Sequence, residues 1–258
     1  MTKGVAVVTG ASAGIGREFC EQLAARGHDL LVVARDRARL ETLGRDLEGR
    51  HRIAVQVAAA DLSVEDDIVR LAERLRAGEA PALLVNNAGF GTRGALADAD
   101  PERQAAMVRL HALAPLRLST AVLPGMVRRG SGGIVNVSSV ASFVYSPGNA
   151  NYCATKAYLT VLTEGMAAEL QGTGVRAQAL CPGFTRTEFH QRMNVSTGDQ
   201  PPFSWLSARG VVEESLRRLD RGGPVVCVPG LGYKALVPLI RLMPRRAIGW
   251  VARRRRRM

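Results

Sequence analysis

The chain has 258 residues, of which 47% are hydrophobic and 22% are charged, and its formal net charge is +12. This length and composition allow one α/β domain with a sizeable buried core, and they require no second domain. The four cysteines are widely spaced and form no Cys-x-x-Cys pair, which argues against a zinc site or a disulfide framework and favours a reducing compartment.

The location expected from the sequence is the cytoplasm. A strand expected from Val5 onward leaves no room for a signal peptide, and no apolar run approaches the ~18 residues that a membrane-spanning helix needs. Nine of the 35 basic residues but none of the 23 acidic residues follow Gly230, so the preceding part holds 26 bases and is nearly neutral. Basicity is therefore a property of the tail and carries no information about the fold.

The first expected element is a strand over residues 4–9, a continuous apolar run bounded by glycine. A glycine-rich turn over residues 10–16 separates it from a helix that ends near Gly27. A strand, a glycine turn and a helix in this order direct backbone N–H groups and the positive end of the helix toward one point, where a pyrophosphate can bind. An ordinary tight connection between strand and helix is the alternative. The candidate cofactor residues of the turn are Gly10, Ser12, Gly14, Ile15 and Gly16.

The second expected strand, residues 29–34, ends in Ala34-Arg35-Asp36, where the ribose of a bound dinucleotide would lie. A small residue followed by arginine leaves room and charge for the 2′-phosphate of NADP, with Arg35 as its partner and the Ser12 hydroxyl as a helper. Spacing from the last glycine points instead to Asp36, whose carboxylate would bind the ribose of NAD. NADP (NADPH) is the preferred cofactor, and NAD stays open as the alternative.

Strands and helices continue to alternate along the chain. A strand over 53–57 leads to Asp61, a candidate for the adenine amine, and to Leu62, a second candidate cofactor contact. Asp61 is equally suited to cap the next helix, for which Ser63 is the expected N-cap. A fourth strand, residues 83–85, ends in Asn86-Asn87-Ala88-Gly89, where amides can hold the strand end and small residues let a cofactor approach.

A long helix is expected over about residues 101–122. It contains Pro115, which has no N–H, so the carbonyl of His111 loses its helical partner and can bind water. Strands over 133–139, 175–180 and 225–228 complete the alternation. The pattern predicts a Rossmann-type α/β fold, a doubly wound parallel sheet of about seven strands flanked by helices, whose ligands bind beyond the carboxyl ends of the strands.

Tyr152 and Lys156 form the candidate catalytic pair. In a helix they share one face at i and i+4, which brings an ammonium close to a phenol. A free tyrosine titrates near pH ~10, and a nearby positive charge lowers that pKa toward the range of acid–base catalysis. Ser139 lies thirteen residues before the tyrosine. Tyr-x-x-x-Lys also occurs by chance, as a partly exposed ring and a solvated amine.

Taken together, these motifs resemble the short-chain dehydrogenases/reductases in their single-domain form, over about residues 4–230. The motifs that carry the resemblance are Thr9-Gly10-x-x-x-Gly14-x-Gly16, Asn86-Asn87-Ala88-Gly89, Ser139, Tyr152-x-x-x-Lys156 and Pro182-Gly183. The resemblance implies an NADP-dependent oxidoreductase in which Tyr152 is the acid and base, Lys156 lowers its pKa and binds the nicotinamide ribose, and Ser139 orients the substrate oxygen. The cofactor residues that it adds are Asn87, Ala88, Gly89, Pro182, Gly183, Thr185 and Thr187.

One position departs from the family pattern, because His111 stands where the family usually has asparagine. In the family, the main-chain carbonyl of that residue holds a water that links the lysine to solvent. A backbone group does not depend on the side chain, so the resemblance implies that the relay persists with His111. The alternative is a packed histidine with satisfied hydrogen bonds. His111 is also the only indication of a rival function, a nucleotide-binding sensor or scaffold that is tethered to a membrane by the tail.

Residues 186–206 lie between the sixth strand and a helix expected over 211–219, where this fold places a cover over the substrate. Its aromatic side chains and methionine favour a lipophilic carbonyl or alcohol substrate of ketoacyl, steroid-like or polyketide type. Packing of the cover onto the core is the alternative. These side chains are Phe189, His190, Met193, Phe203 and Trp205.

Residues 231–258 form a tail beyond a catalytic domain of residues 1–230. Apolar side chains alternate there with arginines, a pattern typical of a surface helix on an anionic membrane, with Trp250 at the interface. Pro238 and Pro244 are expected to break any single long helix. Docking on the core, or on a partner subunit of a homodimer or homotetramer, is the alternative. Nucleic-acid binding is disfavoured, since the bases are confined to one end and aromatic residues are few.

Overall fold

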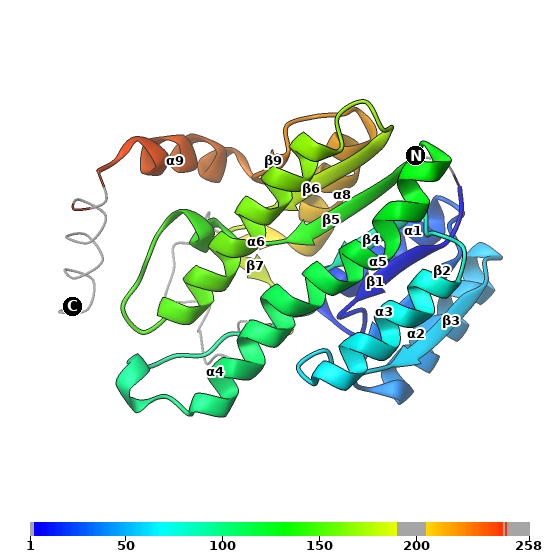
Figure 1. The fold of residues 1–258 in the computed structure, drawn as a ribbon, viewed down its shortest axis with the longest axis horizontal. Coiled ribbons are helices and arrows are strands. Elements are labelled where there is room, and N and C mark those ends of the chain that lie inside the picture. Colours follow the sequence, from blue (N-terminus) through cyan, green and yellow to red (C-terminus); the bar gives the residue numbers. More distant parts are fainter. Residues whose placement is uncertain (1–2, 190–204, 245, 247–258) are drawn as a thin grey trace.

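The computed structural model describes residues 3–189, 205–244 and 246 of the chain. Within these residues, seven parallel strands form one sheet in the order β3-β2-β1-β4-β5-β6-β9 (Figure 1). The strands are β1 (Ala6–Thr9), β2 (Leu30–Ala34), β3 (Val55–Ala59), β4 (Leu83–Asn86), β5 (Gly132–Val137), β6 (Val175–Leu180) and β9 (Val226–Cys227). The predicted doubly wound parallel sheet is therefore confirmed.

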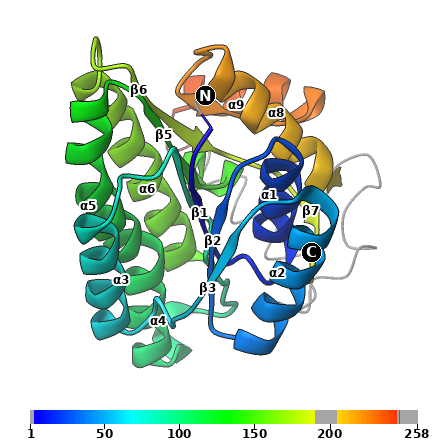
Figure 2. The same ribbon diagram turned by 90° about the vertical axis from the view of Figure 1, so that its right-hand side faces the viewer.

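Helices cover both faces of the sheet (Figure 2). Side chains alternate along β1, so Val8 packs with the helices of one layer and Val7 with those of the other. The apolar runs noted in the sequence are thus buried on both sides, as in other parallel sheets. The first layer consists of α1 (Gly14–Ala25), α2 (Arg37–His51) and α8 (Ala208–Asp220), and the second of α3 (Glu65–Ala77), α5 (Ala114–Arg129) and α6 (Ala150–Glu169).

The strand order changes direction at the centre of the sheet. Strand β1 pairs with β2 on one side and with β4 on the other. In open sheets of this kind, ligands bind outside the carboxyl ends of the strands at such a point. The glycine turn after β1, the amides after β4 and the serines after β5 all lie at this edge, so the fold brings the predicted motifs to one place.

The predicted long helix runs further than expected and is interrupted. A π-helical turn, η2 (Arg109–Leu113), separates α4 (Pro101–Val108) from α5. The turn lies just before Pro115, which cannot donate a helical hydrogen bond. Contrary to the expectation from the sequence, the helical stretch Pro101–Arg129 is long and apolar enough to cross a membrane, although half of the window that passes this test is buried inside the protein, as in a core helix.

Two further local predictions are wrong. Strand β3 begins at Val55 rather than at residue 53, because Arg52 ends α2 in a left-handed conformation with φ of 56°. The N-cap of α3 is Val64 rather than Ser63, and its side chain makes no capping bond. In both cases the element begins one or two residues later than the hydrophobic pattern predicts, because that pattern does not report the backbone conformation of single residues.

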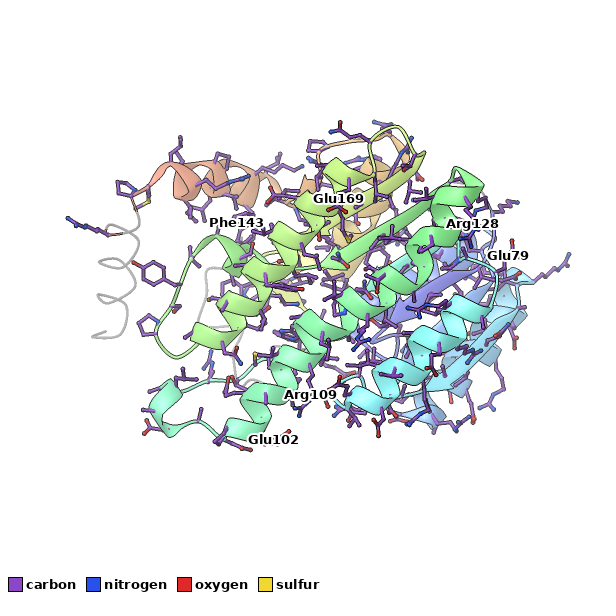
Figure 3. The ribbon with its side chains drawn as sticks, in the orientation of Figure 1. Glu79, Glu102, Arg109, Arg128, Phe143 and Glu169 are labelled. Atoms are coloured by element: carbon purple, nitrogen blue, oxygen red, sulfur yellow. The ribbon has the colours of Figure 1, made fainter. Side chains whose placement is uncertain are left out.

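Helix α9 (Leu231–Leu242) lies at the outer edge of the molecule beyond β9 (Figure 1). It runs through Pro238, where a break was expected, and ends before Pro244. Its Arg241 guanidinium lies 5.7 Å from the centre of the Phe143 ring, which lies beneath α9 in the view of Figure 3. Phe143 ends the short helix η3 (Val140–Phe143), directly after Ser139.

Candidate active site

Side-chain hydrogen bonds join the carboxyl ends of β1 and β4, which form the base of the candidate site. The Thr9 hydroxyl accepts from the backbone N–H groups of Asn87 and Ala88 at 2.9 and 3.0 Å. The Asn87 amide donates to the carbonyl oxygens of Thr9 and Gly10 at 2.9 and 3.3 Å. Each strand end therefore holds the other. This role of Thr9 was not predicted from the sequence, although its place at the start of the glycine motif was a signal.

The start of α1 fits a phosphate group. The N-cap residue, Ala13, provides no capping side chain, and the first turn holds no acidic residue. Gly14 has φ of 56°, and a Cβ there would lie 3.1 Å from the side chain of Thr187. A Cβ at Gly16 would lie 2.2 Å from the carbonyl oxygen of Gly10, so glycine is required. N–H groups that no side chain caps, at a positive helix end, suit a pyrophosphate. The other predicted residues of this turn, Ser12 and Ile15, are half-buried.

Arg35 presents a cation beside the end of β2. Its side chain is 71% exposed, and its guanidinium lies 3.8 Å from the Asp61 carboxylate. Asp36, the alternative ribose ligand, caps α2 by accepting the backbone N–H of Arg39 at 3.0 Å. Asp61 accepts from the backbone N–H and the hydroxyl of Ser63 at 3.0 and 2.6 Å. Both acids thus make local contacts, and Arg35 is the side chain at this edge that suits a 2′-phosphate.

The side chains of Leu62 and Thr185, two of the predicted cofactor residues, are buried in local contacts. The side chain of Leu62 belongs to the core between the sheet and α3. The Thr185 hydroxyl is buried and donates to the carbonyl oxygen of Gly183 at 3.0 Å. Both side chains hold local structure, so any contact with a cofactor falls to their backbone atoms.

The three predicted catalytic side chains meet at the carboxyl end of β5. Helix α6 carries Tyr152 and Lys156 one turn apart, and the phenol is hydrogen-bonded to the Ser139 hydroxyl. The Lys156 amine lies 5.8 Å from the centre of the Tyr152 ring and donates to the carbonyl oxygen of Val137 at 2.8 Å. Ser139 is the N-cap of η3, where its oxygen accepts from the N–H of Ala141 at 3.1 Å. The Val137 carbonyl is a site partner that no side-chain motif could indicate.

Burial is the largest influence on the acidity of both groups on α6. It raises the pKa of Tyr152 to about 12, against the opposite effect of the Ser139 hydrogen bond. It lowers the pKa of Lys156 to about 8. The pKa of Tyr152 is therefore raised rather than lowered in this structure, because loss of water around the phenol has the largest effect. At neutral pH the phenol is protonated.

His111 is a buried ring with both nitrogens bonded. Nε2 accepts from the backbone N–H of Phe90 at 3.1 Å, and Nδ1 lies 3.0 Å from the Thr155 hydroxyl, which donates to the carbonyl oxygen of Tyr152. This pattern assigns the proton to Nδ1 and makes the ring neutral. Burial and, secondly, the charge of Lys156 hold the pKa of His111 well below its ordinary value. The packed, satisfied histidine is thus what the structure shows, and the relay through its main-chain carbonyl stays a prediction.

Two aromatic rings lie beside the Tyr152 ring. Its centre lies 5.8 Å from that of His111, edge to face, and 6.1 Å from that of Phe189. Trp205, at the other end of the predicted cover, is buried and packs on Phe184 with 5.4 Å between ring centres. One part of the cover therefore borders the site and another packs on the protein. The remaining residues named for this segment, His190, Met193 and Phe203, lie outside the described residues.

The turn after β6 is held by Tyr233 of α9. A Cβ at Gly183 would lie 2.0 Å from the Tyr233 ring, so the ring packs directly on the backbone of this turn. The Tyr233 phenol oxygen accepts from the N–H of Phe184 at 3.1 Å. The role of Tyr233 was not predicted from the sequence, because this residue lies in the tail, far along the chain from the turn. The glycine at position 183 was the signal, since glycine often marks a close approach of other atoms.

The sequence model of the family described as short chain dehydrogenase matches residues 4–197. An uncharacterized oxidoreductase of Myxococcus xanthus is 32% identical over 262 residues, which cover 99% of each chain. A solved short-chain dehydrogenase from Sphingobium yanoikuyae, in complex with NADPH, is 34% identical with a TM-score of 0.85 and covers 92% of this chain and 91% of its own. The solved bulky-bulky ketone specific alcohol dehydrogenase from Comamonas testosteroni is 32% identical with a TM-score of 0.79, over 93% and 95% of the two chains.

Proposed function

The chain belongs to the short-chain dehydrogenase family, and from this premise we propose that it is an NADP(H)-dependent oxidoreductase that interconverts a lipophilic ketone and its secondary alcohol. The observation that carries the proposal is the Tyr152 phenol, hydrogen-bonded to Ser139 and with Lys156 beside its ring. This group lies at the edge of the sheet where such folds bind ligands.

The residues present fit a phosphorylated dinucleotide. The first turn of α1 would hold the pyrophosphate, and Arg35 would hold the 2′-phosphate. Asp36 is engaged as the cap of α2, which weakens the case for NAD. The related Sphingobium enzyme was solved with NADPH, which supports the same preference here. When bound, the nicotinamide would supply or accept the hydride.

Tyr152 is the proposed general acid and base. With a pKa of about 12, the phenol is protonated at neutral pH and can give its proton to a carbonyl oxygen. Ser139, already bonded to the phenol, is placed to hold the same oxygen. A proton donor in this position contributes a factor of about 10²–10⁴ to the rate. The protonated phenol favours reduction at neutral pH, and the reverse reaction needs the phenolate.

Lys156 and His111 are proposed to support this chemistry from the protein side. The Lys156 amine, held by the Val137 carbonyl, would bind the nicotinamide ribose. The neutral His111 ring connects the loop after β4 to α6 through Phe90 and Thr155. Because Thr155 also bonds the Tyr152 carbonyl, His111 positions the turn of α6 that carries the phenol.

A large apolar ketone is the proposed substrate. The rings of Phe189 and His111 lie against Tyr152, so a substrate oxygen at the phenol would be flanked by apolar surface. The related Comamonas enzyme is named for its specificity toward bulky ketones, which supports a substrate of similar size. Apolar side chains around a few placed polar groups are usual in sites for such molecules.

A sensor or scaffold without chemistry is the less favoured alternative. Its indication was His111, and in the structure that residue displaces none of the three predicted catalytic side chains. The relatives reported above are named as oxidoreductases and dehydrogenases. Assembly into a homodimer or homotetramer and a cytoplasmic location remain predictions from the sequence.

A substrate screen tests the proposal. The full chain is mixed with NADPH or NADP⁺ and a series of ketones, aldehydes and secondary alcohols of increasing size, and nicotinamide absorbance is followed. We expect NADPH consumption with bulky ketones and little with NADH. Tight NADPH binding without turnover across the whole series would favour the sensor instead.

A further inference from the structure

Helix α9 presents an uncharged apolar face to solvent. Of thirteen large hydrophobic side chains that are exposed among the described residues, five lie in or directly after this helix. We name these five the α9 face: Leu231, Leu236, Leu239, Leu242 and Met243, with exposed fractions of 83, 47, 62, 83 and 37%. Of the other exposed residues between them, Gly232, Ala235 and Pro238 are uncharged, and Arg241 carries a charge. Figure 1 shows α9 at the outer edge of the described molecule, where a large partner has access.

The opposite side of α9 is fixed to the protein. Val237 is buried there against the core. Both basic residues of the helix form ion pairs with the body, Lys234 with Glu214 at 2.6 Å and Arg241 with Glu164 at 3.7 Å. The helix is therefore anchored in one orientation, and its charges lie beside the α9 face rather than on it.

The sequence beyond α9 indicates what this face meets. Residues 244–258 contain seven arginines, five of them consecutive from Arg253 to Arg257, and no acidic residue. An apolar helix face followed by a basic run suits an anionic lipid surface, which offers apolar chains and negative headgroups together. Two copies of the chain joined through this face would bring two arginine runs together with no acid in either tail to balance them. Charge complementarity thus favours lipid over a second copy.

We propose that the α9 face docks the protein on an anionic membrane surface, with its leucines among the upper lipid chains and the arginine run on the headgroups. This goes beyond the proposed oxidoreductase function. Tyr233 connects the docking helix to the candidate site, because it packs on Gly183 and bonds the N–H of Phe184. A docked protein would hold this turn next to the lipid in which lipophilic ketones dissolve.

Vesicle flotation of the full chain tests the proposal. Vesicles of phosphatidylcholine are compared with vesicles in which about one third of the lipid is phosphatidylglycerol, at low and high salt. Two variants separate the contributions. Leu239→Gln with Leu242→Gln removes apolar surface without adding charge, and replacement of Arg253 to Arg257 by glutamine removes the basic run. Leu96→Gln, at a leucine that is 62% exposed elsewhere on the protein, is the matched control.

The parent and the Leu96→Gln control should float with the anionic vesicles only. Replacement of the two leucines should lower the partition coefficient by about tenfold or more, and replacement of the arginines should lower it and abolish its salt dependence. The proposal is wrong if the parent does not float, or if the variants float as well as the parent. The proposal is also wrong if the parent does not bind vesicles but forms an oligomer by light scattering, while the variant with the two leucines replaced is a monomer. That result would show that the α9 face binds a second copy of the chain. NADPH binding and the urea midpoint check that each variant is folded.

Discussion

The amine of Lys156 lies 5.8 Å from the centre of the Tyr152 ring, and burial moves the pKa values of the two groups apart, to about 8 for the amine and about 12 for the phenol. Both groups are therefore easier to hold in their neutral forms than in water. A partly buried, protonated phenol beside a buried amine is a proton donor whose pKa its surroundings can change.

The two directions of the reaction should respond differently to pH. Because Tyr152 has a pKa of about 12, its phenol donates a proton throughout the neutral range, whereas alcohol oxidation needs the phenolate. We expect kcat/KM for oxidation to rise between about pH 7 and 10, while that for ketone reduction does not rise. Initial rates in both directions across this range test the prediction. An oxidation rate that levels off below neutral pH would contradict it.

Replacement of Lys156 by methionine should separate stability from activity. The folded pKa of about 8 lies below the ordinary 10.5, so burial of the charge costs about 3 kcal/mol at neutral pH, a penalty that fades as pH rises from about 8 to 10.5. Loss of the bond to the Val137 carbonyl offsets part of the gain, about 1–3 kcal/mol. We expect Lys156→Met to be at least as stable as the parent in urea at pH 7, with much lower turnover. A large loss of stability would show that the lysine is mainly structural.

Replacement of His111 by asparagine should change stability more than chemistry. Asparagine is too short to reach both Phe90 and Thr155, so a buried group loses its partner at a cost of about 1–3 kcal/mol. His111 is already neutral, so the pH profile of turnover should not move. The parent should lose stability below about pH 6.5, where the unfolded chain binds a proton at His111 and the folded chain does not, and the variant should lose less. A marked gain in activity would mean that the histidine impairs the site.

Replacement of Arg35 by alanine should remove the preference for NADPH. A charged hydrogen bond to the 2′-phosphate contributes about 1.5–3 kcal/mol, so NADPH affinity should fall roughly tenfold to a hundredfold while NADH affinity changes little. Fluorescence titration with both nucleotides measures this. Arg45→Ala, at an exposed arginine further along α2, is the control. Equal affinities for the two nucleotides in the parent would overturn the assignment.

The parallel sheet could be predicted from the sequence, and so could the position of the motifs together at one edge of it. Apolar runs such as the one around Val8 are long and uninterrupted, and parallel strands place whatever follows them at one edge. Tyr152 and Lys156 meet because four positions make about one helical turn, a relationship that is local in the chain.

What the sequence did not reveal depends on contacts between distant residues or on burial. Tyr233 packs on Gly183 across fifty positions, and no motif connects them. The direction of the Tyr152 pKa shift follows from the water excluded around the phenol, which neighbouring charges alone do not determine. From the sequence, Asp36 was a candidate ligand of the ribose of NAD. In the structure its carboxylate accepts the backbone N–H of Arg39 and caps α2.

Turnover of a Tyr152→Phe variant tests the central claim most directly. The substitution removes one hydroxyl and keeps the ring, so NADPH affinity and the urea midpoint should stay close to those of the parent. If the phenol supplies the proton, kcat for the best ketone of the screen should fall by about 10²–10⁴. A variant that reduces this ketone as fast as the parent, with the same NADPH affinity, would show that the proton comes from elsewhere.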